Sequence, residues 1–114
     1  MKARVVSLAL LAVLAGGASR VAAQATGDAK TIYEDNCRKC HGVRGTPPKT
    51  MKEKFPKIAT FDSAFIAQHS ADSIVKVLTK GKNEDMKSFK DKMSKEEMAA
   101  VAKYVREIGS KNKG

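Results

Sequence analysis

Apolar residues recur every three or four positions in three stretches of this 114-residue chain, which predicts three amphipathic helices. The stretches are 27–41 (GDAKTIYEDNCRKCH), 70–81 (SADSIVKVLTKG) and 94–109 (SKEEMAAVAKYVREIG). Ser70 is placed to cap the second stretch, and Ser94 with Glu97 forms the S-x-x-E capping box of the third. A short helix is expected near 62–69. Because no stretch alternates as a strand does, the pattern predicts an all-α fold.

Two long segments separate these helices and are predicted to be loops. Residues 42–61 contain all three prolines of the chain, and residues 82–93 are polar except for Met86, Phe89 and Met93. Loops of this length with isolated apolar residues are uncommon in small domains and are usually functional. We therefore expect the apolar residues of both loops to contact a bound group.

The first 23 residues, 1–23, have the layout of a secretory signal peptide. A basic start is followed by an apolar run over 5–15, and small residues then lead to Ala23. The apolar run is too short to span a membrane, which takes about 20 residues. We expect cleavage after Ala23, export to the periplasm, and one mature domain over 24–114.

The mature domain is basic and too small to build a large core from side chains alone. The predicted leader holds three of the 22 basic residues and none of the 12 acidic ones, so 24–114 carries a formal charge of +7. A domain this small has a poor ratio of core to surface and usually needs a disulfide, metal or cofactor. With no Trp, four Phe and two Tyr, aromatic side chains contribute little to a core. Something other than side chains is expected to fill the middle.

The candidate chemistry lies in CRKCH, where both cysteines of the chain and one of its two histidines fall together. Cys-x-x-Cys-His is the attachment signature of a c-type haem: Cys37 and Cys40 can each add to one vinyl group, and His41 can bind the iron. A disulfide or thioredoxin-like redox pair would also suit an exported protein, but it normally follows a strand. A zinc site would need distant His69 and two adjacent ligands, which is awkward for a tetrahedral metal.

With this motif the mature chain resembles a class I c-type cytochrome, the family of small monohaem electron carriers. The likeness rests on CRKCHG, the proline-bearing loop, the helix that ends at Gly81, the methionine loop GKNEDMKSF, and YVREI in the last helix. It implies a small all-α cytochrome c fold, with three to five helices wrapped around one covalently attached haem c. In the family the first and last helices cross, and Ala29, Tyr33 and Tyr104 stand at that crossing by spacing.

The resemblance also implies the second iron ligand. GKNEDMKSF matches the family's glycine followed by an M-x-x-F loop, which points to Met86 as the axial ligand. A thioether is soft, favours ferrous iron and does not protonate, as a carrier requires. The rival methionines are expected in other roles: Met98 in the core, Met93 as a hydrophobic staple and Met51 in packing or at the surface. His69 remains a rival ligand, although its place before a helix cap is usually a solvated one.

The family also holds the proximal imidazole through its second nitrogen, whose N–H donates a hydrogen bond that fixes the ring. In relatives a backbone carbonyl of the proline-bearing loop is the acceptor. Pro47 and Pro48 follow His41 closely, and we expect Pro48 to supply that oxygen. The alternative role of this proline pair is to stiffen the turn.

With both axial positions filled, the iron has no place for a substrate, so the sequence predicts a periplasmic electron carrier and not an enzyme. Basic residues surround the motif and both loops, which favours transient docking to partners with acidic patches. They are Arg38, Lys39, Arg44, Lys49, Lys52, Lys54, Lys57, Lys82, Lys87 and Lys90. No nucleic-acid-binding motif is present, and membrane contact is expected to be peripheral at most, including docking to membrane-bound oxidase or reductase complexes.

Two other functions stay open from the sequence. A small haem subunit of a fixed redox complex would carry the same motif. If Met86 does not bind iron, a five-coordinate haem could instead serve a gas sensor or weak peroxidase.

Overall fold

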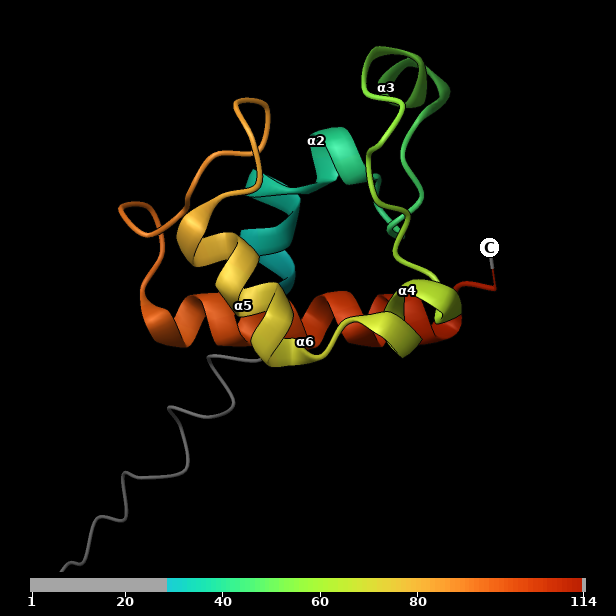
Figure 1. The fold of residues 1–114 in the computed structure, drawn as a ribbon. Helices are drawn as coiled ribbons and strands as arrows, with labels where there is room; N and C mark the ends of the chain where they lie inside the picture. The colour runs from blue at the N-terminus through green and yellow to red at the C-terminus, as the bar shows by residue number, and fades with distance from the viewer. Residues whose placement is uncertain (1–28, 114) are drawn as a thin grey trace, which may run out of the picture.

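The computed structural model describes residues 29–113, and within that range every regular element is a helix. A helix over 29–36 is followed by five labelled helices (Figure 1). They are α2 (Arg38–His41), α3 (Lys49–Lys54), α4 (Ser63–Gln68), α5 (Ala71–Lys80) and α6 (Lys95–Lys111). The all-α prediction is confirmed. The predicted leader, 1–23, lies outside the described residues.

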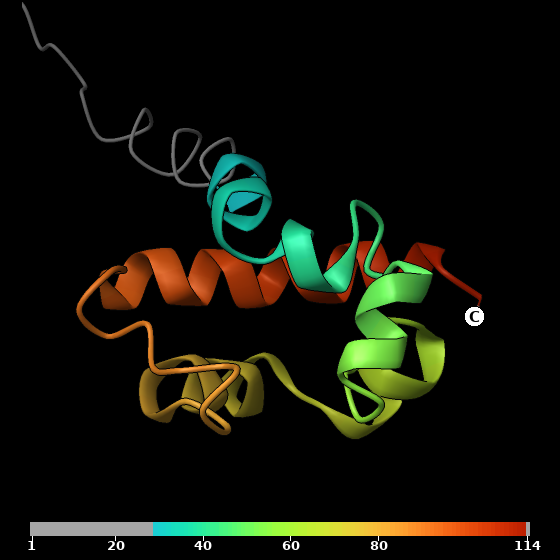
Figure 2. The ribbon, with the colours of Figure 1, turned by 90° about the horizontal axis from the view of Figure 1, so that it is seen from above.

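Helix α6 is the longest element, and the others gather around it (Figures 1 and 2). Its start is fixed by the predicted capping box: Ser94 Oγ accepts the Glu97 N–H, and the Glu97 carboxylate accepts the Ser94 N–H. Met98, Val101 and Val105 are buried along one face. This stripe repeats every three or four residues, so one side of α6 forms the surface on which the other helices pack.

The helix over 29–36 crosses α6, as the resemblance implies (Figure 2). Ala29 and Tyr33 are buried, and the ring centroids of Tyr33 and Tyr104 lie 5.3 Å apart. Tilted aromatic pairs at this separation contribute about 0.5–1.5 kcal/mol beyond their buried area. The crossing thereby anchors the segment that leads into the two cysteines.

On the other side, α5 packs against α6 through buried Ile74 and Leu78 (Figure 2). Its N-terminus is capped by Ser70, as predicted, and it ends at Gly81. Gly81 has φ +75°, and a Cβ there would lie 2.6 Å from the Ser88 amide nitrogen, so the return of the following loop requires glycine.

Helix α4 was expected near 62–69 and covers Ser63–Gln68, with Asp62 accepting the Phe65 N–H as its cap. The α4 helix also packs on α6. The Arg106 guanidinium of α6 donates to the carbonyl oxygens of Ile66 and His69, so α6 also holds the end of α4.

Two features differ from the predicted pattern. The stretch 27–41 is not one helix in the described part, because a turn at Cys37 separates 29–36 from α2. The expected loop 42–61 contains α3. No residue of α3 is buried, so this helix has no apolar stripe from which it could have been recognised.

The core formed by side chains is small. Its buried apolar members are Ala29, Tyr33, Cys37, Phe61, Ile74, Leu78, Met93, Met98, Val101, Ala102 and Val105. Within residues 29–113, no helix has the length and apolar character needed to span a membrane.

Candidate functional site

A cavity of about 690 Å³ opens between α2, the segment 54–61, α5 and the loop that follows α5. Its volume falls in the range of cofactor and small-molecule sites, about 300–1,000 Å³. The walls carry apolar side chains from every direction, including Ile74, Leu78 and Val105. A large and mainly apolar group would fit this space.

Cys37 and Cys40 lie one helical turn apart at one wall of the cavity, and both are free thiols. The Cys40 and His41 amides donate to the Cys37 carbonyl oxygen at 3.2 and 2.9 Å, so a tight turn sets their spacing. Burial, and secondarily Cys40, raises the pKa of the Cys37 thiol to about 11. A reactive redox cysteine has a lowered pKa, so the raised pKa of Cys37 does not fit the nucleophile of a thioredoxin-like site.

The His41 ring is held on two sides. It stacks on Phe61, with ring centroids 4.6 Å apart and planes 18° apart, and its Nδ1 lies 3.1 Å from the Ala59 carbonyl oxygen. Nδ1–H donation to a carbonyl leaves Nε2 as the free lone pair, which is the form that binds a metal. Burial lowers the pKa of His41, with Lys82 adding to the effect and the Ala59 hydrogen bond opposing it. The imidazole is therefore favoured in its neutral, ligating state.

The expectation that Pro48 holds His41 is wrong in this structure, since the carbonyl that faces Nδ1 belongs to Ala59. The Pro48 carbonyl is already used at the start of α3, where it accepts the amides of Met51 and Lys52 at 2.9 and 3.0 Å. Pro48 is the N-cap of α3, and a cap carbonyl accepts the first hydrogen bonds of its own helix.

Gly42 fixes the direction of the chain directly after His41. It has φ +83°, and a Cβ there would stand 2.0 Å from the Thr46 carbonyl oxygen. The buried Tyr33 hydroxyl donates to the Gly42 carbonyl at 2.7 Å. The first helix is thus tied to the end of the CRKCHG motif.

Met86 lines the cavity from the loop that follows α5. Of the four methionines in residues 29–113, only Met86 lines the cavity. Met98 and Met93 are buried in the core, as expected for them, and Met51 lies on α3. The sequence prediction of Met86 therefore matches the placement of a thioether in the cavity wall.

His69 also lines the cavity, and its ring is held in the same way as that of His41, so it stays a rival ligand. It stacks on Phe65 with centroids 4.1 Å apart, and its Nδ1 lies 2.9 Å from the Phe65 carbonyl oxygen. Phe65 in turn contacts Phe61, the residue that stacks on His41. His69 is thus linked through these rings to the His41 side of the site.

The described residues also contain no cluster of three or more His, Cys, Asp or Glu side chains suited to a metal ion, which disfavours the zinc alternative.

These donors fit a c-type haem. Two thiols one turn apart suit its two vinyl groups, a neutral imidazole and a thioether suit its iron, and the apolar walls suit its ring. Sequence reasoning missed Ala59, since the backbone carbonyl of an alanine carries no sequence signal. It also missed Phe61, which could have been noted as an isolated apolar residue at the end of the 42–61 loop.

Comparison with known proteins identifies the family of the chain. A family profile described as "Cytochrome C oxidase, cbb3-type, subunit III" matches residues 24–105. A solved structure described as the KustC0563 c-type cytochrome is 29% identical, with a TM-score of 0.64, and the match covers 72% of this chain and 98% of that one. A tyrosine-to-phenylalanine mutant of the same protein is also 29% identical, with a TM-score of 0.63 and coverage of 71% and 98%. The search of curated proteins gave no significant match. The chain therefore belongs to the family described as cytochrome c oxidase, cbb3-type, subunit III, and is a c-type cytochrome of class I.

Proposed function

We propose that this protein carries single electrons between larger redox partners in the periplasm, on one covalently bound haem c. Haem-based electron transfer is the activity of the c-type cytochrome family. The observation that carries the proposal is that a neutral imidazole, His41, and a thioether, Met86, line one apolar cavity together with two free thiols. In this assignment Cys37 and Cys40 form the thioether bonds.

The proposed ligand set explains why the protein would carry electrons and not act on a substrate. The His41 imidazole and the Met86 sulfur would fill both axial positions of the iron, which leaves no open position for a reactant. Haem supplies the one-electron chemistry when bound, while the protein sets its potential and its access to partners. Neither ligand has to be exchanged during transfer, so little reorganisation accompanies it.

Redox titration with simultaneous optical spectroscopy on the exported, haem-loaded protein tests this assignment. The oxidised protein should show the weak long-wavelength band of an iron–thioether bond, and Met86→Ala should abolish it. Met98→Leu is the matched control, because Met98 is buried on α6 away from the cavity. Absence of the band in the wild type would reject Met86 as the ligand and leave either His69 ligation or a five-coordinate sensor or weak peroxidase.

The charges at the cavity support docking to acidic partners. Five exposed lysines line the cavity and form what we call the basic rim: Lys54, Lys57, Lys82, Lys87 and Lys92. Val43, beside the motif, is 58% exposed. A small apolar spot near a basic rim suits a brief, electrostatically steered encounter. We propose that partners present an acidic patch to this face.

A second function has one observation in its favour: the family description names a subunit of an oxidase. The chain could be the haem subunit of a fixed redox complex and not a mobile carrier. Co-purification distinguishes the two. A mobile carrier should separate from membrane complexes at high salt, since exposed charge contacts are screened, whereas a fixed subunit should stay bound.

A further inference from the structure

The loop that carries Met86 is closed onto α5 at its returning end. The Phe89 amide donates to the Leu78 carbonyl oxygen at 2.8 Å, and the Ser88 hydroxyl donates to the Thr79 carbonyl oxygen at 2.5 Å. These bonds fix where the loop returns to α5. They do not determine how the backbone of Met86 itself is oriented.

Hydrogen bonds inside the loop orient that backbone. The Asn83 Oδ1 atom accepts the Met86 amide at 2.9 Å and the Asp85 amide at 3.0 Å. The Met86 carbonyl oxygen accepts the Lys82 amide at 2.8 Å and the Asn83 amide at 3.3 Å. Both polar groups of Met86 are therefore tied back to residues 82 and 83. Of these bonds, only those to Asn83 Oδ1 depend on a side chain.

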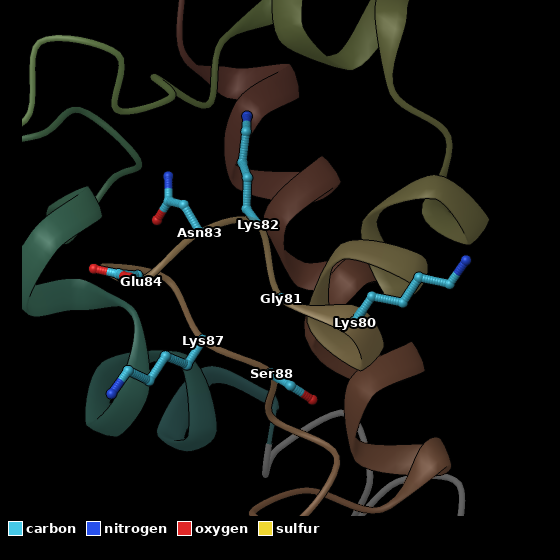
Figure 3. A pocket seen from close by; sticks show the side chains of 7 residues that line it. All are labelled: Lys80, Gly81, Lys82, Asn83, Glu84, Lys87 and Ser88. Carbon is cyan, nitrogen blue, oxygen red and sulfur yellow. The ribbon is translucent and has the colours of Figure 1, made fainter.

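Figure 3 shows the loop around a shallow hollow of about 410 Å³ on its polar side. The long side chains of Lys80, Lys82 and Lys87 extend away from the backbone in different directions. Among the side chains of that hollow, which all belong to the described residues, only Asn83 and Ser88 make hydrogen bonds. Ser88 holds the end of the loop, so Asn83 alone acts on Met86.

We propose that Asn83 is a positioning residue for Met86, whose carboxamide holds the loop in the conformation that presents the thioether to the cavity. The inference rests on the proposed function, in which Met86 is an iron ligand. A free loop would have to lose conformational entropy each time the sulfur reached the iron. Asn83 removes part of that cost by ordering the backbone of the ligand in advance.

This role has a consequence that differs between the two oxidation states. A thioether is a soft ligand that suits ferrous iron better than ferric iron. Loosening the loop should therefore release Met86 from the oxidised protein first. If Asn83 only stabilised the fold, its loss would lower the stability of the oxidised and reduced proteins equally. The binding of Met86 to the iron would then stay unchanged.

Imidazole competition on the haem-loaded, oxidised protein provides the test. Added imidazole binds only where Met86 has left the iron, so its apparent affinity rises with the Met86-free fraction. Asn83→Ala should bind imidazole about tenfold more tightly than the wild type, the order expected from two lost hydrogen bonds, and should show a weaker thioether band. Asn83→Asp keeps an oxygen acceptor and should stay within about threefold of the wild type. Gln68→Ala is the matched control, because it removes an exposed amide outside the cavity wall.

The outcomes separate this inference from the proposed function. A wild type without the thioether band, or a Met86→Ala variant that keeps it, rejects the ligand assignment and with it the role of Asn83. If Met86 passes that test but Asn83→Ala binds imidazole as Gln68→Ala does, only the positioning role is rejected. Equal effects of the Ala and Asp changes would also reject it. Should Asn83→Ala not accumulate, Asn83→Gln moves the same oxygen by one methylene, and unchanged imidazole affinity there would overturn the inference.

Discussion

Tyr33 is the residue on which the geometry of the motif depends most outside the motif itself. Its side chain is fully buried, and its hydroxyl donates to the Gly42 carbonyl oxygen at 2.7 Å. Tyr33→Phe keeps the ring but removes the shorter of the two hydrogen bonds to that carbonyl, leaving only the Gly45 amide at 3.4 Å. We expect a loss of about 1–3 kcal/mol in the free energy of unfolding, measured by urea denaturation of the haem-loaded protein. Tyr104→Phe should change it by less than about 0.5 kcal/mol.

The same residue predicts a dependence on alkaline pH. Burial raises the pKa of Tyr33 well above its usual value, with Cys37 and Tyr104 adding smaller effects. The folded protein thus binds the phenolic proton more tightly than the unfolded chain does. This contribution to stability is complete below about pH 10 and is lost as the pH rises further. In Tyr33→Phe the alkaline loss should be shallower, and an unchanged pH profile would contradict the assignment.

For single residues, the sequence predicts the side chains proposed to bind the haem better than the groups that orient those side chains. Cys37, Cys40, His41 and Met86 could be named because thiols, imidazole and thioether are chemically distinctive. Ala59 could not, since any residue type supplies a carbonyl oxygen and only the folded chain shows which one faces Nδ1. Pro48 lies close to the motif along the chain, but its carbonyl oxygen accepts hydrogen bonds from the first turn of α3.

Among the elements, α6 depends most on its first turn. Ser94 and Glu97 form a reciprocal capping box at the start of the helix that underlies the cavity. Ser94→Ala should cost about 1 kcal/mol of unfolding free energy, measured by urea denaturation. Because the two side chains act on the same turn, Ser94→Ala with Glu97→Ala should cost less than the sum of the single changes. Ser110→Ala, at the exposed end of the same helix, is the control, and an equal loss there would contradict the role of the box.

The elements also show where apolar periodicity is informative. Helices α5 and α6 each bury a regular stripe and begin at a serine cap, so their bounds follow closely from the sequence. Helix α3 buries no residue, and short α2 follows a turn at Cys37. Neither has a stripe of its own. Their positions depend on the motif and the cavity, which are tertiary features.

For the whole molecule, the cavity predicts that folding depends on its occupant. Without an occupant, the apolar side chains that line the cavity of 690 Å³, among them Ile74, Leu78 and Val105, would face water and lose the burial that stabilises the fold. Small domains have only about 5–15 kcal/mol of total stability. A Cys37→Ala, Cys40→Ala double variant, made without haem, should therefore have much less helix by circular dichroism and no sharp thermal transition. A haem-free chain with full helicity and cooperative unfolding would contradict this.

The distribution of charge predicts how partners approach the molecule. Lys57 belongs to the basic rim of the cavity, whereas Lys103 is equally exposed on α6 but does not line it. Lys57→Glu should slow electron exchange with an acidic redox partner by about threefold to tenfold at low ionic strength, because steering acts on the rate of encounter. The difference should shrink as salt is added, since the Debye length falls to about 8 Å at 0.15 M. Both substitutions change the net charge equally, so stopped-flow rates for Lys57→Glu and Lys103→Glu separate a local docking surface from a general effect of charge. Equal slowing would mean that net charge alone attracts the partner and that the basic rim has no special part in docking.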